Sequence, residues 1–213
     1  MRVDVWSDLV CPWCYVGKRR FERALASFPR RGDLQIVYRS FQLDPRSPRG
    51  SSLPRREALM AKYGLTDAEA DAMDVRMTQT AAAEGLEYHL AGGVTGNTFD
   101  AHQLVHLGAT HNRQDAVVER LFHAHFTERR SIFERASLVQ IAAEAGLEAV
   151  EAGDALNTDR FAEDVAADVQ EARALRITGV PFFLIERQYG VSGAQPVDLF
   201  GAVLERVWTV ASS

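Results

Sequence analysis

The pair Cys11 and Cys14 constrains this chain more than any other feature, because these are the only two cysteines among 213 residues. The residues ahead of the pair, Arg2-Val3-Asp4-Val5-Trp6, alternate polar and apolar side chains, as a strand with one buried face does. Residues 17–28 behind the pair carry apolar side chains at the spacing of an amphipathic helix. The sequence therefore predicts a Cys-x-x-Cys pair at a junction between a strand and a helix.

That position favours redox chemistry. The free amide protons and the positive dipole end of a first helical turn stabilise a thiolate. Pro12 suits the opening of a helix, because its missing N–H would have had no partner there. Cys14 is one turn further in and can attack a mixed disulfide formed on Cys11. We therefore interpret Cys11 as the accessible nucleophile and Cys14 as the resolving thiol.

Two other interpretations of the pair are weaker. A structural zinc site needs four ligands, and the chain has no second cysteine pair. A structural disulfide across two residues would constrain little unfolded-chain entropy. His102 and His106 have the spacing of a helical metal site, but Gln103 stands where a His-Glu-x-x-His motif needs glutamate. The sequence predicts neither a metal nor a cofactor.

Composition narrows the classes of function. A hydrophobic share of 46% with 25% charged residues is typical of a globular protein with a full core. No apolar run reaches the roughly 18–20 residues that span a bilayer, and the N-terminus resembles no signal peptide, so we expect a cytoplasmic protein with no membrane partner. Cytosolic disulfides are more often catalytic than structural. A net charge of −5 argues against nucleic acid, and the basic runs 18–20 and 30–31 are interpreted as solvated faces.

The order of patterns along the chain predicts an α/β fold with an insertion. A second strand is predicted at 34–39, two more at 182–185 and 189–192, and a final helix after Pro196. Between these ends, the pattern from 55 to 176 is mostly helical, with capping boxes at Thr66–Glu69 and Ser137–Gln140 and a flexible glycine-rich break at 92–96. We predict a sheet domain from 1–41 and 177–213, and an inserted helical domain at 42–176.

Four motifs carry a family resemblance. Cys11-Pro12-Trp13-Cys14 after the first strand and Gly179-Val180-Pro181 before the third resemble the thioredoxin superfamily. More narrowly, these motifs with Asn97-Thr98-Phe99-Asp100-Ala101-His102 and residues 191–195 are similar to the DsbA-like branch with an inserted helical domain, specifically the FrnE-like oxidoreductases. The resemblance covers nearly the whole chain. It implies a thioredoxin-like fold with a large inserted α-helical domain, and a dithiol-disulfide oxidoreductase or isomerase.

The resemblance also assigns site residues. It implies that Pro181 follows a cis peptide bond, faces the disulfide and is catalytic together with Cys11 and Cys14. The backbone of Val180 would then pair with an extended substrate. The further residues expected to bind substrate are Pro12, Trp13, Asn97, Asp100 and His102. We also interpret Trp13, Tyr15 and Phe41 as an apolar rim for a peptide or a small thiol.

Two other classes of function remain open. Kappa-type glutathione transferases and chromene-carboxylate isomerases share the architecture but typically carry serine where Cys11 stands, which leaves glutathione-dependent transfer or isomerisation as an alternative. The second alternative is not an enzyme but a binding module whose binding depends on the redox state of the cysteine pair. Trp13 replaces the histidine of better-known DsbA proteins, so their oxidising strength does not transfer. The expected partners are protein or small-molecule thiols and disulfides, with glutathione as a candidate, and the sequence leaves the oligomeric state open.

Overall fold

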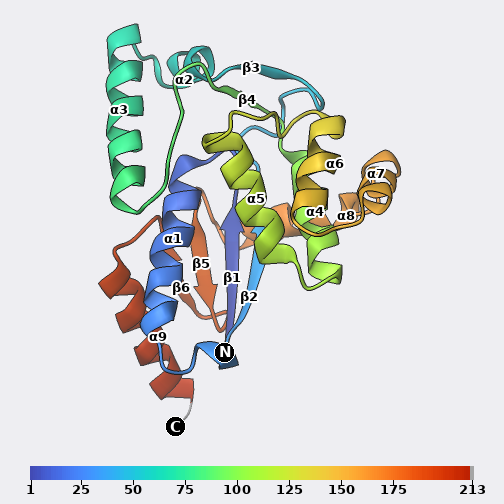
Figure 1. The fold of residues 1–213 in the computed structure, drawn as a ribbon. Helices are drawn as coiled ribbons and strands as arrows, with labels where there is room; N and C mark the ends of the chain where they lie inside the picture. Colours follow the sequence, from blue (N-terminus) through green and yellow to red (C-terminus); the bar gives the residue numbers. More distant parts are fainter. Residues whose placement is uncertain (212–213) are drawn as a thin grey trace.

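The computed structural model describes residues 1–211, and its centre is a four-stranded mixed sheet in the order β2-β1-β5-β6 (Figure 1). The central strand β1 (Arg2–Ser7) pairs in parallel with β2 (Gln35–Ser40) and antiparallel with β5 (Phe182–Ile185). β5 in turn pairs antiparallel with β6 (Tyr189–Ser192). Strands from both ends of the chain therefore form one sheet, as the sequence predicts.

Both faces of β1 are covered. Val3 and Val5 point into the large core under α1 (Pro12–Ser27) and α9 (Val197–Ala211). Trp6 points to the opposite face, where its indole N–H donates to the Asp168 carbonyl in α8 (Ala162–Ala174) at 3.1 Å. The expectation of a strand with one buried face is wrong here, because the polar face of β1 is buried as well.

Asp4 shows how a charge is accommodated on that second face. The side chain is fully buried and accepts hydrogen bonds from the guanidinium groups of Arg2 and Arg39 at 2.9 Å each. Burial alone would raise the pKa of Asp4, but the two guanidinium groups outweigh it and lower the pKa. Asp4 is therefore ionised and paired inside the fold.

The segment between β2 and β5 is largely helical and surrounds one end and one side of the sheet. Its helices are α2 (Arg55–Tyr63), α3 (Asp67–Ala83), α4 (Phe99–Thr110), α5 (Gln114–Phe126), α6 (Arg135–Glu144), α7 (Ala149–Asn157) and α8. In Figure 1, α2 and α3 lie beyond the end of the sheet at which α1 begins, and α4 to α8 lie on the β2 side. The fold is thus α/β, thioredoxin-like, with a helical insertion.

The predicted boundaries inside the insertion are partly correct. The capping box at Thr66 and Glu69 is confirmed, with Thr66 N donating to Glu69 Oε2 at 2.8 Å. The box predicted at Ser137 is wrong, because α6 has Glu134 as its N-cap and Ser137 lies in its first turn. A short antiparallel pair, β3 (Ser52–Pro54) and β4 (Val94–Gly96), replaces the flexible break expected near 92–96. Three-residue strands leave too little periodicity to predict.

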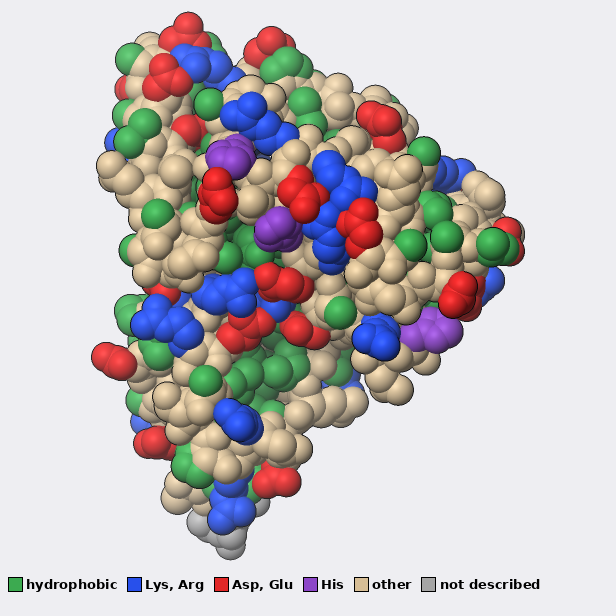
Figure 2. All heavy atoms as spheres, viewed as in Figure 1, with side chains coloured by type: hydrophobic (Ala, Val, Ile, Leu, Met, Phe, Trp, Pro, Cys, Tyr) green, Lys and Arg blue, Asp and Glu red, His purple; other side chains and the backbone are tan. Residues whose placement is uncertain are grey.

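The contact between α1 and α5 corrects another interpretation. Lys18 is 3% exposed, and its ammonium pairs with Glu22, with Asp115 at 3.1 Å and with Glu119 at 2.8 Å. The basic run 18–20 is therefore not a solvated face at Lys18. Two of the carboxylates that allow Lys18 to be buried come from α5, roughly 100 residues later in the sequence. The local pattern around Lys18 therefore could not predict them. Figure 2 shows acidic and basic side chains interleaved across this face of the molecule.

Within residues 1–211, the structure contains no helix with the length and the apolar character needed to cross a membrane.

Candidate active site

The cysteine pair lies where the sequence predicts, at the start of α1. Cys11 is the N-cap residue and Pro12 opens the helix. The Cys11 amide donates to the Asp8 carbonyl at 3.0 Å, and the Cys14 amide donates to the Cys11 carbonyl at 3.0 Å. Both thiols are free, so the structure shows the dithiol form. The two turns link the end of β1 to α1, and Cys14 in the first turn of the helix belongs to the same buried core as Val3 and Val5 of β1.

The proline loop before β5 meets the first cysteine. The Val180–Pro181 peptide bond is cis, as the resemblance implied. The Cys11 thiol faces the Val180 carbonyl with an S–O distance of 3.6 Å, within reach of a weak hydrogen bond. The Pro181 carbonyl accepts from the Gly193 amide at 2.8 Å, which fixes the loop to the turn after β6. Val180 is thus in contact with the sulfur.

Gly17 allows α1 to approach this loop closely. A Cβ atom at position 17 would lie 2.7 Å from Cγ of Pro181 and 3.4 Å from Cβ of Ala194. Carbon atoms in contact are normally about 3.5–4 Å apart, so only glycine fits without a shift of the proline ring. Gly17 belongs to the motif that opens with Ser7, but the helical pattern around Gly17 did not indicate its contact with Pro181.

The two sulfur sites are both nearly closed to solvent. Cys11 is 5% exposed and Cys14 is 2% exposed, so the predicted greater accessibility of Cys11 stays a prediction. Burial raises the pKa of Cys14 well above its ordinary value, and the neighbouring Cys11 raises it further. The Ser7 hydroxyl and the Asp8 backbone N–H act in the opposite direction. Cys14 is therefore protonated at neutral pH, as a waiting second thiol would be.

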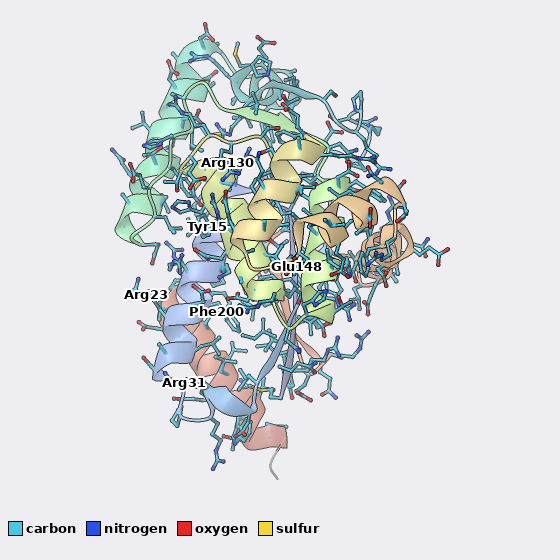
Figure 3. The ribbon with its side chains drawn as sticks, turned by 45° about the vertical axis from the view of Figure 1, so that its right-hand side comes forward. Tyr15, Arg23, Arg31, Arg130, Glu148 and Phe200 are labelled. Atoms are coloured by element: carbon cyan, nitrogen blue, oxygen red, sulfur yellow. The ribbon has the colours of Figure 1, made fainter. Side chains whose placement is uncertain are left out.

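The three aromatic residues expected at the rim divide between surface and core. Trp13 is 46% exposed at the opening of α1. Phe41 is half-buried and, like Val180, packs against the cluster around Trp6. Tyr15 is 2% exposed and stacks on Phe122 at 4.9 Å between ring centroids, where α1 faces α5 (Figure 3). The interpretation of Tyr15 as a rim residue is therefore wrong.

Tyr88 is a site residue that the sequence did not reveal. It follows α3 in a stretch without regular periodicity, and it is 4% exposed. Its hydroxyl donates to the Pro12 carbonyl at 2.8 Å, inside the Cys-Pro-Trp-Cys turn. Burial raises the pKa of Tyr88, and the nearby Cys11 and Cys14 raise it further. The insertion thus reaches the first turn of α1 directly.

Asn97 and Asp100, expected to bind substrate, hold the loop between β2 and β3. The Asn97 amide donates to the carbonyls of Pro45 at 3.3 Å and Ser47 at 2.7 Å. Asp100 is 3% exposed and accepts from Arg49 and from Arg135. These polar contacts fix the loop to the start of α4. The structure therefore gives both residues partners within the protein, and their role toward substrate stays a prediction.

His102 lies closer to the cysteine pair. Its Nε2 is 3.0 Å from the Phe41 carbonyl and 3.5 Å from Oδ1 of Asp8. The other Asp8 oxygen accepts from the Leu43 amide at 2.7 Å. Of the predicted residues Asn97, Asp100 and His102, it is His102 that has a polar contact with the segment from Ser7 to Cys14.

His106, four residues after His102, has different partners. Its Nε2 lies 3.0 Å from Asp168 and 3.1 Å from the Ser40 hydroxyl. The two imidazoles therefore do not converge. Over the described part of the chain, histidine, cysteine and carboxylate side chains form no cluster of three suited to a metal ion.

Comparisons with known proteins agree with this geometry. The family model of the DSBA-like thioredoxin domain matches residues 2–205. The structure is similar to that of the probable DsbA oxidoreductase SCO1869 from Streptomyces coelicolor, with 44% identity, a TM-score of 0.93, and coverage of 98% of this chain and 90% of that one. The cytosolic disulfide reductase DsbM from Pseudomonas aeruginosa shares the fold at 20% identity and a TM-score of 0.69, over 99% and 100% of the chains. The uncharacterized protein YwbO of Bacillus subtilis is 27% identical over 202 residues, 94% of each chain.

Proposed function

This chain belongs to the DsbA-like thioredoxin family, and on that premise we propose that it is a thiol-disulfide oxidoreductase with Cys11 as nucleophile and Cys14 as resolving thiol. One observation carries the proposal. Two free thiols stand at the first turn of α1, and the sulfur of Cys11 lies 3.6 Å from the Val180 carbonyl in the proline loop. A substrate joined to Cys11 through its sulfur would therefore run next to this loop, within reach of the loop backbone.

The reaction is a pair of exchanges. The Cys11 thiolate attacks a substrate disulfide, which forms a mixed disulfide and releases one substrate thiolate. Cys14 then attacks the Cys11 sulfur, which closes the Cys11–Cys14 disulfide and releases the second substrate thiol. The substrate gains two electrons and the protein loses two. The reverse sequence oxidises a dithiol substrate through the same sulfurs.

The surroundings of the sulfurs support exchange with a thiol or a disulfide presented by another molecule. Trp13 is 46% exposed beside the pair, and the half-buried Phe41, like Val180, packs against the cluster around Trp6. Both surfaces suit an extended peptide segment or a small thiol such as glutathione. DsbM, which shares this fold, has also been solved with glutathione, so glutathione is a reasonable first small substrate to test.

Trapping tests the assignment of the two thiols. In Cys14→Ser, the first exchange proceeds and the second does not, so mixed disulfides on Cys11 should accumulate in cell extract and be visible by mass spectrometry. The matched variant Cys11→Ser should trap nothing and lose turnover of a model disulfide. Trapping on Cys14 in Cys11→Ser, with none on Cys11 in Cys14→Ser, would reverse the two roles.

The same variants separate the other two classes of function. A glutathione-dependent transferase or isomerase would largely keep its activity in Cys14→Ser, and a redox-gated binding module would keep its binding. The similarity to a 2-hydroxychromene-2-carboxylate isomerase, at 15% identity and a TM-score of 0.76, shows the fold alone. The presence of both cysteines favours dithiol exchange over either alternative.

A further inference from the structure

Two buried side-chain atoms of the described residues lack a hydrogen-bond partner, and both stand just ahead of the cysteine pair. They are Oγ of Ser7 and Oδ1 of Asp8. An unpaired buried hydroxyl costs about 1–3 kcal/mol, so such a group is uncommon in a folded protein. Ser7 lies next to a buried thiol that must ionise, so its hydroxyl is in a position to interact with the thiolate.

Strand geometry places the Ser7 side chain on the same face as Cys14. Ser7 ends β1, and alternation puts its side chain on the face of Val3 and Val5, which α1 covers. Cys14, in the first turn of α1, belongs to the same buried cluster as Val3 and Val5. Ser7 is 5% exposed and Cys14 is 2% exposed, so water has little access to either group.

We propose that the Ser7 hydroxyl is the hydrogen-bond donor that stabilises the Cys14 thiolate while Cys14 resolves the mixed disulfide on Cys11. The inference rests on the proposed thiol-disulfide exchange. In the dithiol form, Oγ of Ser7 makes no hydrogen bond, yet it lies near enough to the Cys14 sulfur to lower the pKa of that thiol. When Cys14 loses its proton, the sulfur becomes an acceptor with a full charge, and the hydroxyl turns toward it.

The electrostatics of Cys14 agree with this role. Burial raises the pKa of Cys14, and the Ser7 hydroxyl and the Asp8 backbone N–H both act to lower it. The titratable groups that interact with Cys14 or with its neighbours are Cys11 at the N-cap of α1, Asp8, Tyr88 from the insertion, and His102 and His125 through Asp8. A substitution at Ser7 changes none of these side chains.

The step balances without a further reagent. The Cys14 thiol gives its proton to the buffer, and the resulting thiolate attacks the Cys11 sulfur. A Cys14–Cys11 bond forms, and the bond from Cys11 to the substrate sulfur breaks. The electron pair of that bond leaves on the substrate thiolate. Ser7 donates a hydrogen bond and is not consumed.

Stopped-flow reaction with 5,5′-dithiobis(2-nitrobenzoate) separates the two exchanges. The first phase releases one thionitrobenzoate as Cys11 attacks, and the second phase releases another as Cys14 resolves the adduct. In Ser7→Ala, we expect an unchanged first phase and a second phase roughly ten- to a hundredfold slower, because a hydrogen bond to a charged group contributes about 1.5–3 kcal/mol. The pH profile of the second phase should shift to higher pH. Ser7→Thr, which keeps the hydroxyl, should restore the rate.

Ser40→Ala is the matched control. Ser40 pairs with Ser7 across β1 and β2 and is 1% exposed, but its hydroxyl contacts His106. The Ser40→Ala variant should leave the rates of both phases unchanged, even if the substitution lowers the stability of the protein. A second phase in Ser7→Ala that equals the wild type, or an equal slowing in Ser40→Ala, overturns the inference. A wild-type protein without a second phase would instead contradict the proposed role of Cys14 itself.

Discussion

The ammonium of Lys18 is a single charge on which the contact between α1 and α5 depends. Burial would lower the pKa of Lys18, but the attraction of Asp115, Glu119 and Glu22 outweighs it and raises the pKa. Burial likewise would raise the pKa of Glu119, and Lys18, with Tyr15 and Arg19, lowers it instead. The residues stabilise each other's charges, so the loss of Lys18 would leave Glu22 and Glu119 with Arg19 as their remaining partner.

Lys18→Met should therefore destabilise the protein by about 1–3 kcal/mol, less than the loss of one partner from a fully buried ion pair, because Glu22 and Glu119 are partly exposed and keep Arg19 as a partner. Urea unfolding at pH 7 measures the change. Lys62→Met is the control, because Lys62 is the only other lysine and lies exposed at the end of α2. The folded-state pKa of Lys18 is raised, so its contribution is present at neutral pH and is lost only as the pH rises through that value. Similar losses for both variants would contradict the argument.

His125 predicts a pH dependence in the acid range. Its imidazole is 8% exposed, and burial, with Arg55 as a second cause, lowers its pKa from 6.5 to about 4. Between these values the unfolded chain binds a proton that the folded protein does not bind. Stability should thus fall by about 3 kcal/mol from this group alone as the pH falls from 6.5 to 4.

His125→Leu should remove that dependence. Urea unfolding from pH 7 to pH 4 should show a smaller loss of stability in the variant than in the wild type, with the difference growing below pH 6.5. His123→Leu is the matched control on the same helix, where the side chain is exposed and pairs with Glu128. Parallel curves for wild type and His125→Leu would show that the imidazole titrates alike in both states.

Among the elements, α1 combines a catalytic start with a close packing contact. Gly17→Ala would normally stabilise a helix by about 1 kcal/mol. Here the added methyl group would overlap Pro181, with 2.7 Å to its Cγ. We expect destabilisation and slower disulfide exchange, because the proline loop must move away from Cys11.

Gly201→Ala is the comparison for this prediction. Gly201 lies inside α9, and a Cβ there would meet no atom within 4 Å. That variant should gain stability and keep its exchange rate. Thermal unfolding and the first phase of the thionitrobenzoate reaction measure the two effects. If Gly17→Ala behaves like Gly201→Ala, the glycine is not what sets the distance between helix and loop.

At the same scale, the sequence predicts elements whose cause is local. The strand ahead of Cys11, the helix that opens with Pro12 and the capping box at Thr66 depend on signals within a few residues, and each is found. The outer edge of β2, in contrast, is covered by a residue that is far away in the sequence. Gln114 of α5 pairs its amide group with both the N–H and the C=O of Tyr38, at 2.9 and 3.0 Å, and so covers the strand edge. Two residues 76 positions apart carry no periodic signal.

The candidate site divides in the same way. The motifs predict Cys11, Cys14 and the proline loop, because their chemistry is visible in residue types and order. The hydroxyl of Tyr88 on the Pro12 carbonyl and the buried, unpaired Ser7 depend on how the insertion and the first strand close around the helix. Their roles become visible only when the chain is folded.

In the whole molecule, the insertion and the sheet share one core. Tyr15 of α1 stacks with Tyr88, Phe122 and Phe126 from the insertion, with centroid distances from 4.9 to 6.3 Å. On the other face, Trp6 of β1 donates to the Asp168 carbonyl in α8. Buried residues of both parts belong to the same cluster. Residues 42–176 are thus inserted between the two halves of the sheet domain in the sequence, but among the described residues they do not have a separate core.

The shared core predicts that the two parts unfold together. All three tryptophans, Trp6, Trp13 and Trp208, lie outside 42–176, and most helical residues lie inside it. Fluorescence thus reports the sheet domain, and far-UV circular dichroism mainly reports the insertion. In reducing buffer, the urea transitions from both probes should coincide, as a single cooperative unit requires.

Phe122→Ala sharpens this test, because Phe122 is fully buried in the stack that joins the two parts. A cavity of this kind costs about 3–5 kcal/mol, and in one cooperative unit both probes should report the same loss. If the insertion were only docked on the sheet, the variant would lower the circular dichroism midpoint and leave the fluorescence midpoint in place. Because Tyr15 lies one residue after Cys14, the loss of this stack should also loosen the first turn of α1, and disulfide exchange should slow with stability.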